Sequence, residues 1–280
     1  MLKKALFALP LALVLAGPVS ANSGKAPEDV LKALIDKHES SYLTQSPQNL
    51  MMMPDNPAHY LAEEGEVLFK QARGPKNASL EQCNFGKGPG VLKGAYVELP
   101  RYFADARKVM DLEARLVYCM KTLQGFTDAD AAVKKRHGSD SDMMKLQTYI
   151  AAESNGMKWN PPMKHPLERA MRAAGEEMFY RRAGTMDFAC STCHAQSDKR
   201  IRASVLPNLA APHEWTKAIS WPAQRVSHDN VRSSQHRVLE CLWQMRYPNI
   251  EMGSDATIAI ISFWTDAARG QPAILPDLKR

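Results

Sequence analysis

Cys190-Ser191-Thr192-Cys193-His194 is the stretch of the 280-residue sequence that decides its fold. The pattern C-x-x-C-H is typical of covalent attachment of a c-type haem, with a thioether from each cysteine and the adjacent histidine as proximal iron ligand. A zinc ribbon would need a second C-x-x-C, which the sequence lacks. A thioredoxin-type redox pair would need a βαβ context, which the pattern does not indicate. The motif therefore predicts one covalent haem c, held by Cys190 and Cys193, with His194 on the iron.

The N-terminus has the composition of a secretory signal peptide, which we assign to residues 1–21. Lys3 and Lys4 supply the positive start, Ala5–Gly17 is apolar, and Val19-Ser20-Ala21 is a small-residue cleavage site. The apolar run is too short to cross a bilayer as a helix. We therefore expect an exported protein without a membrane span.

The charge of the mature chain limits its partners. Without Lys3 and Lys4, 34 basic residues remain against 30 acidic ones, a net charge of +4. A mildly basic exported protein suits anionic small molecules or an acidic protein partner. Nucleic acid is not expected as a partner, because the compartment is wrong and no module of aromatic and basic residues appears.

An internal repeat surrounds the motif. Five positions recur at an offset of 110 residues, and three later positions recur at an offset of 122. The first set is Gly65, Glu66, Phe69, Gly74 and Cys83, recurring as Gly175, Glu176, Phe179, Gly184 and Cys193. The second set is Pro100, Arg115 and Cys119, recurring as Pro222, Arg237 and Cys241. Two offsets shared by this many positions favour a duplicated unit, and the change of offset indicates an insertion in the second copy.

The order of elements in each copy predicts a mainly α fold. Each copy shows a helix, an attachment loop, an irregular loop, a helix and a terminal helix, with little period-2 alternation. This order resembles the class I cytochrome c fold, in which the terminal helices cross near a small residue. We expect two tandem domains of this kind, over residues 61–158 and 159–280. An N-terminal helix, with Ala26–Ser40 as its amphipathic stretch, and a linker would fill residues 22–60.

The first copy has lost the residues that bind haem. Leu80 stands where the second copy has Cys190, and Asn84 stands where it has His194. The domain over residues 61–158 should therefore carry no haem. Its cysteines, Cys83 and Cys119, would face one another across the missing cofactor. In an oxidising compartment we expect them to form a disulfide worth on the order of 4 kcal/mol, the alternative being two free buried thiols.

Cys241 is then the cysteine left without a partner. Arg237 lies four residues before it, so on a helix both side chains share a face. A guanidinium there favours a thiolate and offers a fork to a sulfur oxyanion. Spacing alone leaves the distal haem ligand open between Cys241, Met245 and a histidine. It also leaves open that Cys241 is a small core residue.

Three stretches together resemble the SoxA family, the catalytic cytochrome subunits of SoxAX complexes in thiosulfate-oxidising bacteria. They are Gly94-Ala95-Tyr96-Val97-Glu98-Leu99-Pro100-Arg101-Tyr102-Phe103, the Cys190–His194 motif, and Arg237 with Cys241. The resemblance covers nearly the whole mature chain. The sequence has no second C-x-x-C-H in its first domain, so it is similar to the single-haem members.

The resemblance implies a periplasmic L-cysteine S-thiosulfotransferase. Such an enzyme joins thiosulfate oxidatively to a cysteine of the SoxYZ carrier protein, and the electrons leave through haem to the partner cytochrome SoxX. It implies that Cys241 is both the distal haem ligand and the catalytic sulfur, often as a persulfide, that Arg237 stabilises its charge, and that His194 is the proximal ligand. It also implies the Cys83–Cys119 disulfide. The alternative function is a pure electron-transfer cytochrome with methionine or histidine as distal ligand.

Overall fold

The computed structural model describes residues 56–201, 204–211, 214–248 and 250–279, which belong to one compact unit. The expected signal peptide and the amphipathic stretch over residues 26–40 lie outside the described residues. Within the described ranges, no helix is both long enough and apolar enough to cross a membrane.

The elements of the first copy are mostly helical and short. In chain order they are α3 (Pro57–Lys70), η1 (Leu80–Gln82), η2 (Tyr96–Glu98), β1 (Arg101–Phe103), β2 (Lys108–Met110), α4 (Leu112–Cys119), η3 (Met120–Gln124), α5 (Ala131–Lys134) and α6 (Asp142–Ala152).

The elements of the second copy follow a similar order. They are α7 (Pro166–Tyr180), α8 (Cys190–His194), β3 (Arg200–Ile201), β4 (Ser204–Val205), α9 (Trp215–Ile219), β5 (Ala223–Arg225), η5 (Val226–His228), β6 (Asn230–Arg232), α10 (Ser234–Gln244), α11 (Asp255–Ala267) and β7 (Asp277–Lys279).

Polar caps at the N-termini explain where the longer helices begin. Each of these residues accepts a hydrogen bond from a backbone N–H of the first turn, which would otherwise be unpaired. The capping residues are Asn56 for α3, Asp111 for α4, Ser141 for α6, His165 for α7, Ser233 for α10 and Ser254 for α11. Proline occupies the first turn of both α3 and α7, where its missing N–H is not needed.

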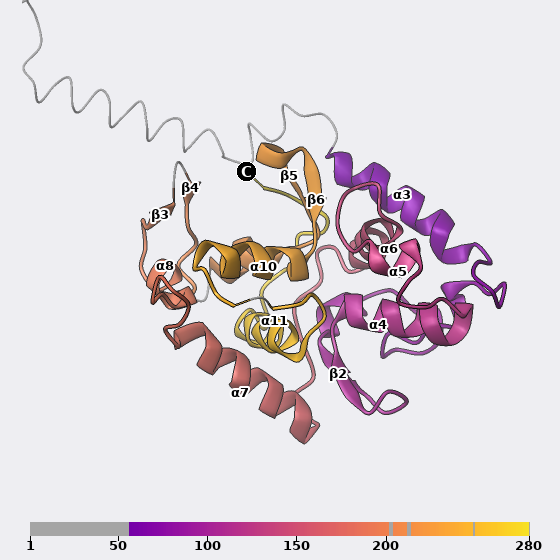
Figure 1. Cartoon of the computed structure of the whole chain (residues 1–280), viewed down its shortest axis with the longest axis horizontal. Helices are drawn as coiled ribbons and strands as arrows, with labels where there is room; N and C mark the ends of the chain where they lie inside the picture. Colours follow the sequence, from indigo (N-terminus) through magenta and orange to yellow (C-terminus); the bar gives the residue numbers. More distant parts are fainter. Residues whose placement is uncertain (1–55, 202–203, 212–213, 249, 280) are drawn as a thin grey trace, which may run out of the picture. The chain divides into compact units, whose positions relative to one another are not determined.

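The first and last helices of each copy cross at a glycine. A Cβ at Gly65 of α3 would lie 2.0 Å from the carbonyl oxygen of Lys145 in α6. A Cβ at Gly175 of α7 would lie 1.9 Å from that of Ala259 in α11. Both crossings therefore require glycine, as expected for terminal helices that meet at a small residue. Figure 1 shows α7 running close to α11 and α3 close to α6.

The short hairpins recur as well. Strands β1 and β2 pair antiparallel in one copy, and β5 and β6 do so in the other. Strand β7 adds to β5 in parallel, which brings the end of the described chain beside the second hairpin. Each of these strands is only three residues long, so they leave no alternation that a sequence pattern could reveal.

The two copies share one hydrophobic core. The same cluster of buried side chains includes Phe69 of α3 and Phe179 of α7. The Tyr96 hydroxyl donates to the backbone oxygen of Trp221, 2.5 Å away, and so joins one copy to the other. The described chain is thus a mainly helical, cytochrome c-like structure in which side chains from α3 and α7 share one hydrophobic core.

Candidate functional site

The attachment motif forms a single turn of helix, α8. The turn begins after Ala189, whose N–H donates to the Thr192 hydroxyl at 3.0 Å. The Nδ1 atom of His194 lies 3.0 Å from the carbonyl oxygen of Pro207. A carbonyl oxygen can only accept, so Nδ1 must donate and Nε2 keeps its lone pair. Burial lowers the pKa of His194, which favours the neutral imidazole that binds a metal.

The three free cysteines share one neighbourhood. Burial raises the pKa of Cys190 to about 12, and the charge of Cys241 adds to the effect. Burial and then the charge of Cys241 also raise the pKa of Cys193. The charge of Cys241 on α10 thus acts on both attachment thiols of α8. None of the three is in a disulfide.

Arg237 and Cys241 lie one turn apart on α10. The charge of Cys241 is the largest cause that raises the pKa of Arg237 above its usual value. The Arg237 Cζ atom also lies 6.0 Å from the centroid of the Trp221 ring. The arrangement places a guanidinium, fixed in its cationic form, where it can stabilise a thiolate and bind an anion.

A pocket of about 400 Å³ opens beside this helix face. Its lining combines two guanidinium groups with one carboxylate and two imidazoles. The lining residues are Arg225, His228, His236, Arg237, Leu239, Glu240, Trp243 and Gln244. Burial lowers the pKa of His236 to about 4, and the charge of Arg232 adds to this effect. At neutral pH this histidine is therefore uncharged, and Arg225 and Arg237 contribute positive charge to the pocket.

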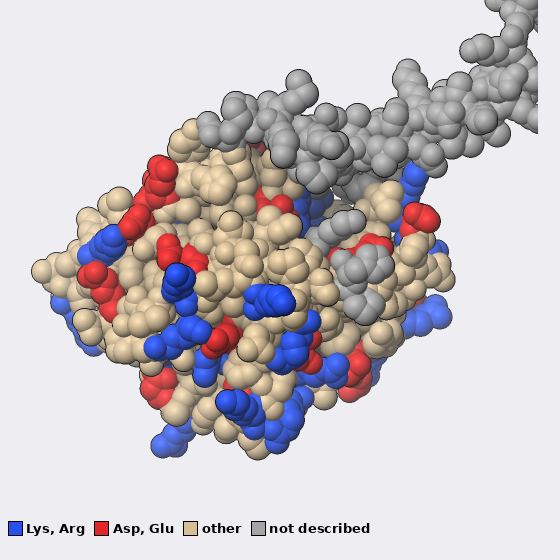
Figure 2. Space-filling model, turned by 180° about the vertical axis from the view of Figure 1, so that it is seen from behind, with Lys and Arg blue, Asp and Glu red and all other residues tan. Residues whose placement is uncertain are grey.

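Glu240 occupies the centre of this charge cluster. Its Oε2 accepts from Arg237 Nη1 at 3.0 Å, and its Oε1 lies 3.5 Å from Arg232 Nε. Burial alone would raise the pKa of Glu240, but the hydrogen bond and charge of Arg237 outweigh it and lower the pKa. The carboxylate is therefore ionised at neutral pH. Elsewhere, on the face shown in Figure 2, basic and acidic side chains intermix.

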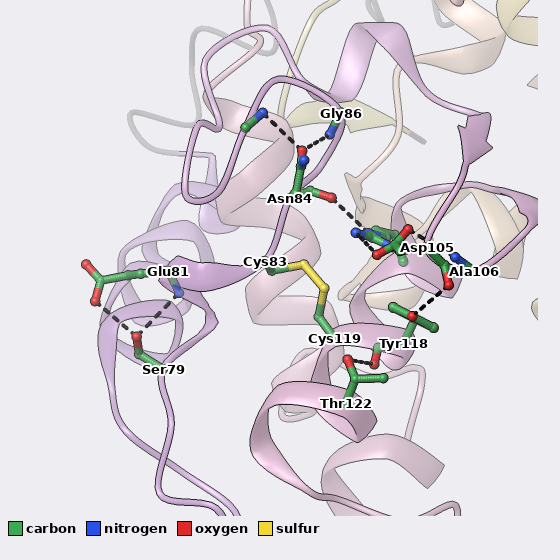
Figure 3. Close-up of a disulfide and its surroundings, with 12 residues drawn as sticks. Ser79, Glu81, Cys83, Asn84, Gly86, Asp105, Ala106, Tyr118, Cys119 and Thr122 are labelled. Carbon is green, nitrogen blue, oxygen red and sulfur yellow. Dashed lines mark hydrogen bonds and ion pairs between the residues drawn. A yellow bond between two sulfur atoms is a disulfide. The ribbon is translucent and has the colours of Figure 1, made fainter.

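The equivalent place in the first copy is closed by a covalent bond. Cys83 and Cys119 form a disulfide with Cα atoms 5.8 Å apart (Figure 3). Leu80, at the position of Cys190, is fully buried. The Asn84 side chain, at the position of His194, accepts from the backbone N–H of Gly86 at 2.7 Å. The residues at these positions are thus engaged in packing, a turn and a cross-link.

The donor set of the second copy fits a c-type haem. His194 offers Nε2 with its tautomer set by Pro207, and Cys190 and Cys193 are free thiols on the same turn. Among the described residues, no cluster of three or more His, Cys, Asp or Glu side chains could hold a metal ion alone. A c-type haem would bring its own four nitrogen ligands, so His194 and the two cysteines of the turn could hold it without such a cluster.

Several residues of the site had no sequence signal. Pro207 and Glu240 act through contacts that only the folded chain reveals, and Arg225 comes from strand β5. Met245, one of the alternative distal ligands, is 6% exposed and lies in the hydrophobic core. For Glu240 the sequence offers only its spacing. It lies three residues after Arg237, which allows an ion pair on a helix, and one residue before Cys241.

Comparison with known proteins gives consistent results. Residues 64–159 match the family model described as the SoxA/TsdA cytochrome c domain. The chain is 45% identical to the L-cysteine S-thiosulfotransferase subunit SoxA of Hydrogenophilus thermoluteolus, over 80% of this chain and 83% of that protein. It is 33% identical to the subunit of the same name from Hydrogenobacter thermophilus, over 79% of this chain and 83% of that protein.

A solved structure has a similar fold. The crystal structure of SoxXA from P. pantotrophus matches with a TM-score of 0.66 and 22% identity, covering 80% of this chain and 79% of that chain. At this identity the match bears on the fold alone, and it agrees with the helical, cytochrome c-like arrangement described above.

Proposed function

The chain belongs to the SoxA family of L-cysteine S-thiosulfotransferase subunits, and from this premise we propose that it joins thiosulfate oxidatively to a cysteine of a SoxYZ carrier protein. The relatives' shared name favours this conjugation over plain electron transfer. The overall change is RSH + S₂O₃²⁻ → RS–S–SO₃⁻ + H⁺ + 2 e⁻, in which R is the carrier chain. A c-type haem, when bound, would accept these electrons one at a time and pass them to the partner cytochrome SoxX.

Four residues would hold that haem. Cys190 and Cys193 would form the thioethers, and His194 would bind the iron through Nε2, with Pro207 fixing its orientation. Cys241 would be the distal ligand, with its sulfur available for chemistry. Support comes from the proximity of Cys241 to the two attachment thiols.

Cys241 would carry the reacting sulfur, and Arg237 would be its catalytic partner. The Arg237 guanidinium favours the thiolate and pairs with the sulfonate end of thiosulfate. Loss of two electrons joins the outer sulfur of thiosulfate to the Cys241 sulfur. The carrier thiolate then attacks that outer sulfur, forms the product disulfide and releases the Cys241 thiolate. The pairing of Arg237 with a free cysteine is the observation that carries this proposal.

The remaining organisation follows from the repeat. We propose two tandem cytochrome c-like domains over residues 61–158 and 159–280, with one covalent haem in the second and none in the first. The recurring helix crossings and the Cys83–Cys119 disulfide support this division. The protein would act in the periplasm as a heterodimer with a SoxX cytochrome, and the pocket beside α10 would admit the carrier's cysteine-bearing segment.

A reconstituted assay tests the function. The holoprotein is combined with SoxX, reduced SoxYZ, thiosulfate and an electron acceptor, and the mass of the carrier is followed. The proposal expects a carrier mass increase matching one thiosulfate, abolished in a Cys241→Ala variant that retains its haem. A Cys241→Ala variant that modifies the carrier at the normal rate would reject the catalytic role.

A further inference from the structure

Arg237 needs a side-chain partner to hold its guanidinium in a single place. The side chain is long and about one fifth exposed (21%), so several rotamers are open to it. The ring of Trp221, with its centroid 6.0 Å away, bounds the guanidinium without fixing its orientation. Only a directional hydrogen bond would select the rotamer that keeps the charge beside Cys241.

Glu240 supplies that bond. The 3.0 Å contact from Arg237 Nη1 to Glu240 Oε2 is the shortest of this carboxylate's ion pairs. Its other contacts, to Arg232 Nε at 3.5 Å and His236 Nε2 at 3.8 Å, are looser. Arg232 belongs to strand β6, so Glu240 also ties the helix that carries Cys241 to the neighbouring hairpin.

The two copies differ at this point. At the offset of 122, the counterpart of Glu240 is Tyr118, and the arginine equivalent to Arg237 is Arg115. Arg115 takes its carboxylate from the hairpin instead, 2.8 Å from Asp105. The counterpart of Asp105 in the second copy is Ser227, which carries no charge. The carboxylate partner of the arginine has therefore moved next to the cysteine in the copy where the cysteine is free.

We propose that Glu240 is a positioning residue, which holds the Arg237 guanidinium against the Cys241 sulfur and so sets the reactivity of that sulfur toward anions. This inference rests on the proposed roles of Cys241 and Arg237. This role explains why a carboxylate lines a basic pocket, although the negative charge of Glu240 by itself would repel an anionic substrate.

The charge of Glu240 and its hold on Arg237 have opposite effects on the reaction of Cys241 with anions, so a substitution of Glu240 shows which effect dominates. In Glu240→Gln the pocket loses a negative charge, so a purely electrostatic role would increase the selectivity of the sulfur for anions. A positioning role gives the reverse, because an uncharged amide oxygen binds the guanidinium more weakly than a carboxylate does, and the guanidinium then spends less time beside the sulfur. Charge and position therefore predict opposite changes.

Alkylation of Cys241 measures this directly. The holoprotein is treated with reductant to remove any persulfide and then with iodoacetate or iodoacetamide. Mass spectrometry of the peptide containing Cys241 gives each rate. The ratio of the rate with iodoacetate, an anion, to the rate with neutral iodoacetamide reports whether the guanidinium lies beside the sulfur. We expect this ratio to fall roughly tenfold in Glu240→Gln, the lower end of the losses of affinity or activity that follow when an outer-shell partner of a metal ligand is removed. Glu177→Gln, which removes an exposed carboxylate on α7, should leave the ratio unchanged.

A double-mutant cycle separates positioning from general loosening. In an Arg237→Ala background, Glu240→Gln should cause no further fall, because no guanidinium remains to be positioned. An unchanged or increased ratio in the single Glu240→Gln variant would overturn the proposal, and so would an equal fall in both backgrounds. Haem content and thermal unfolding are recorded for each variant.

The readout does not depend on catalysis. It needs neither the carrier nor transfer of thiosulfate. Failure of the wild-type protein to modify the carrier would reject the proposed function, whereas the alkylation ratios would still decide the role of Glu240. We expect the thiosulfate-transfer rate of Glu240→Gln to fall in parallel with the alkylation ratio, which would connect the role of Glu240 to the proposed function.

Discussion

Arg115 and Arg237 are equivalent residues of the two copies with different partners. The Arg115 side chain is 4% exposed, pairs with Asp105 and donates from Nε to the backbone oxygen of Asn84 at 2.8 Å. Its guanidinium is thus occupied by the fold. Arg237 lies instead on the wall of an open pocket and beside the free thiol of Cys241. Arg115 stabilises the fold, and we propose that Arg237 takes part in the reaction.

Replacing Arg237 with alanine tests that division. Arg237→Ala should lower thiosulfate transfer far more than haem content, because the helix and the attachment loop keep their packing. Both quantities are measured on the same preparation, by carrier mass and by the absorbance of the haem. Equal loss of both would assign Arg237 a structural role.

The matched control is Arg115→Ala. This variant leaves a part-buried backbone oxygen without its donor and removes the partner of Asp105, which should cost about 1 kcal/mol of stability. Transfer per haem should remain near that of the wild type. A selective loss of transfer in Arg115→Ala would show that the two copies are not divided as described.

At the scale of elements, the sequence predicts the parts that repeat. The glycine crossings of α3 with α6 and of α7 with α11 follow from Gly65 and Gly175, and the repeat also predicts the pairing of Cys83 with Cys119. The hairpins could not be predicted, because two or three residues show no period. Pro207 beside His194 and Trp221 beside Arg237 could not be predicted either, because they lie outside the helices and no sequence spacing indicates these contacts.

The disulfide should stabilise the first copy in place of a cofactor. Both cysteines are almost fully buried, and the bond closes a segment with a sequence separation of 36. Cys83→Ala/Cys119→Ala should lower the free energy of unfolding by on the order of 4 kcal/mol. Denaturant titration measures the loss, and haem content should stay unchanged, since the attachment motif lies in the other copy.

Two results would contradict this view. Unfolding of the double variant at the same denaturant concentration as the wild type would leave the bond without a stabilising role. A fall of haem content in step with stability would place the disulfide and the haem in one cooperative site.

At the scale of the whole molecule, buried polar groups join the two copies. Asp111 of the first copy accepts from Gln235 Nε2 of the second at 2.6 Å. Close by, Glu113 is fully buried and accepts from Gln147 Nε2 at 3.2 Å. Burial, followed by the charge of Asp111, raises the pKa of Glu113 to about 8. The Glu113 carboxyl group is therefore mostly protonated in the folded protein at neutral pH.

This junction makes stability depend on pH. Below about pH 4.5 the folded and unfolded chains both keep the Glu113 proton, so its contribution to stability is complete. As pH rises from there to about 8, only the unfolded chain releases the proton, and stability falls by up to about 1.4 kcal/mol per pH unit. Glu113→Gln should remove this part of the slope.

Denaturant unfolding of the wild type and Glu113→Gln across that range measures the difference. The variant should gain stability relative to the wild type as pH increases, whereas Glu177→Gln should follow the wild-type curve. Parallel curves for the wild type and Glu113→Gln would show that Glu113 is ionised in the folded protein throughout.

Electron paramagnetic resonance of the ferric holoprotein tests the central claim most directly, because it reports which side chain binds the iron opposite His194. The account predicts a low-spin signal of thiolate character that is lost in Cys241→Ala and kept in Met245→Leu. A spectrum typical of methionine or bis-histidine ligation, unaffected by Cys241→Ala, would contradict it.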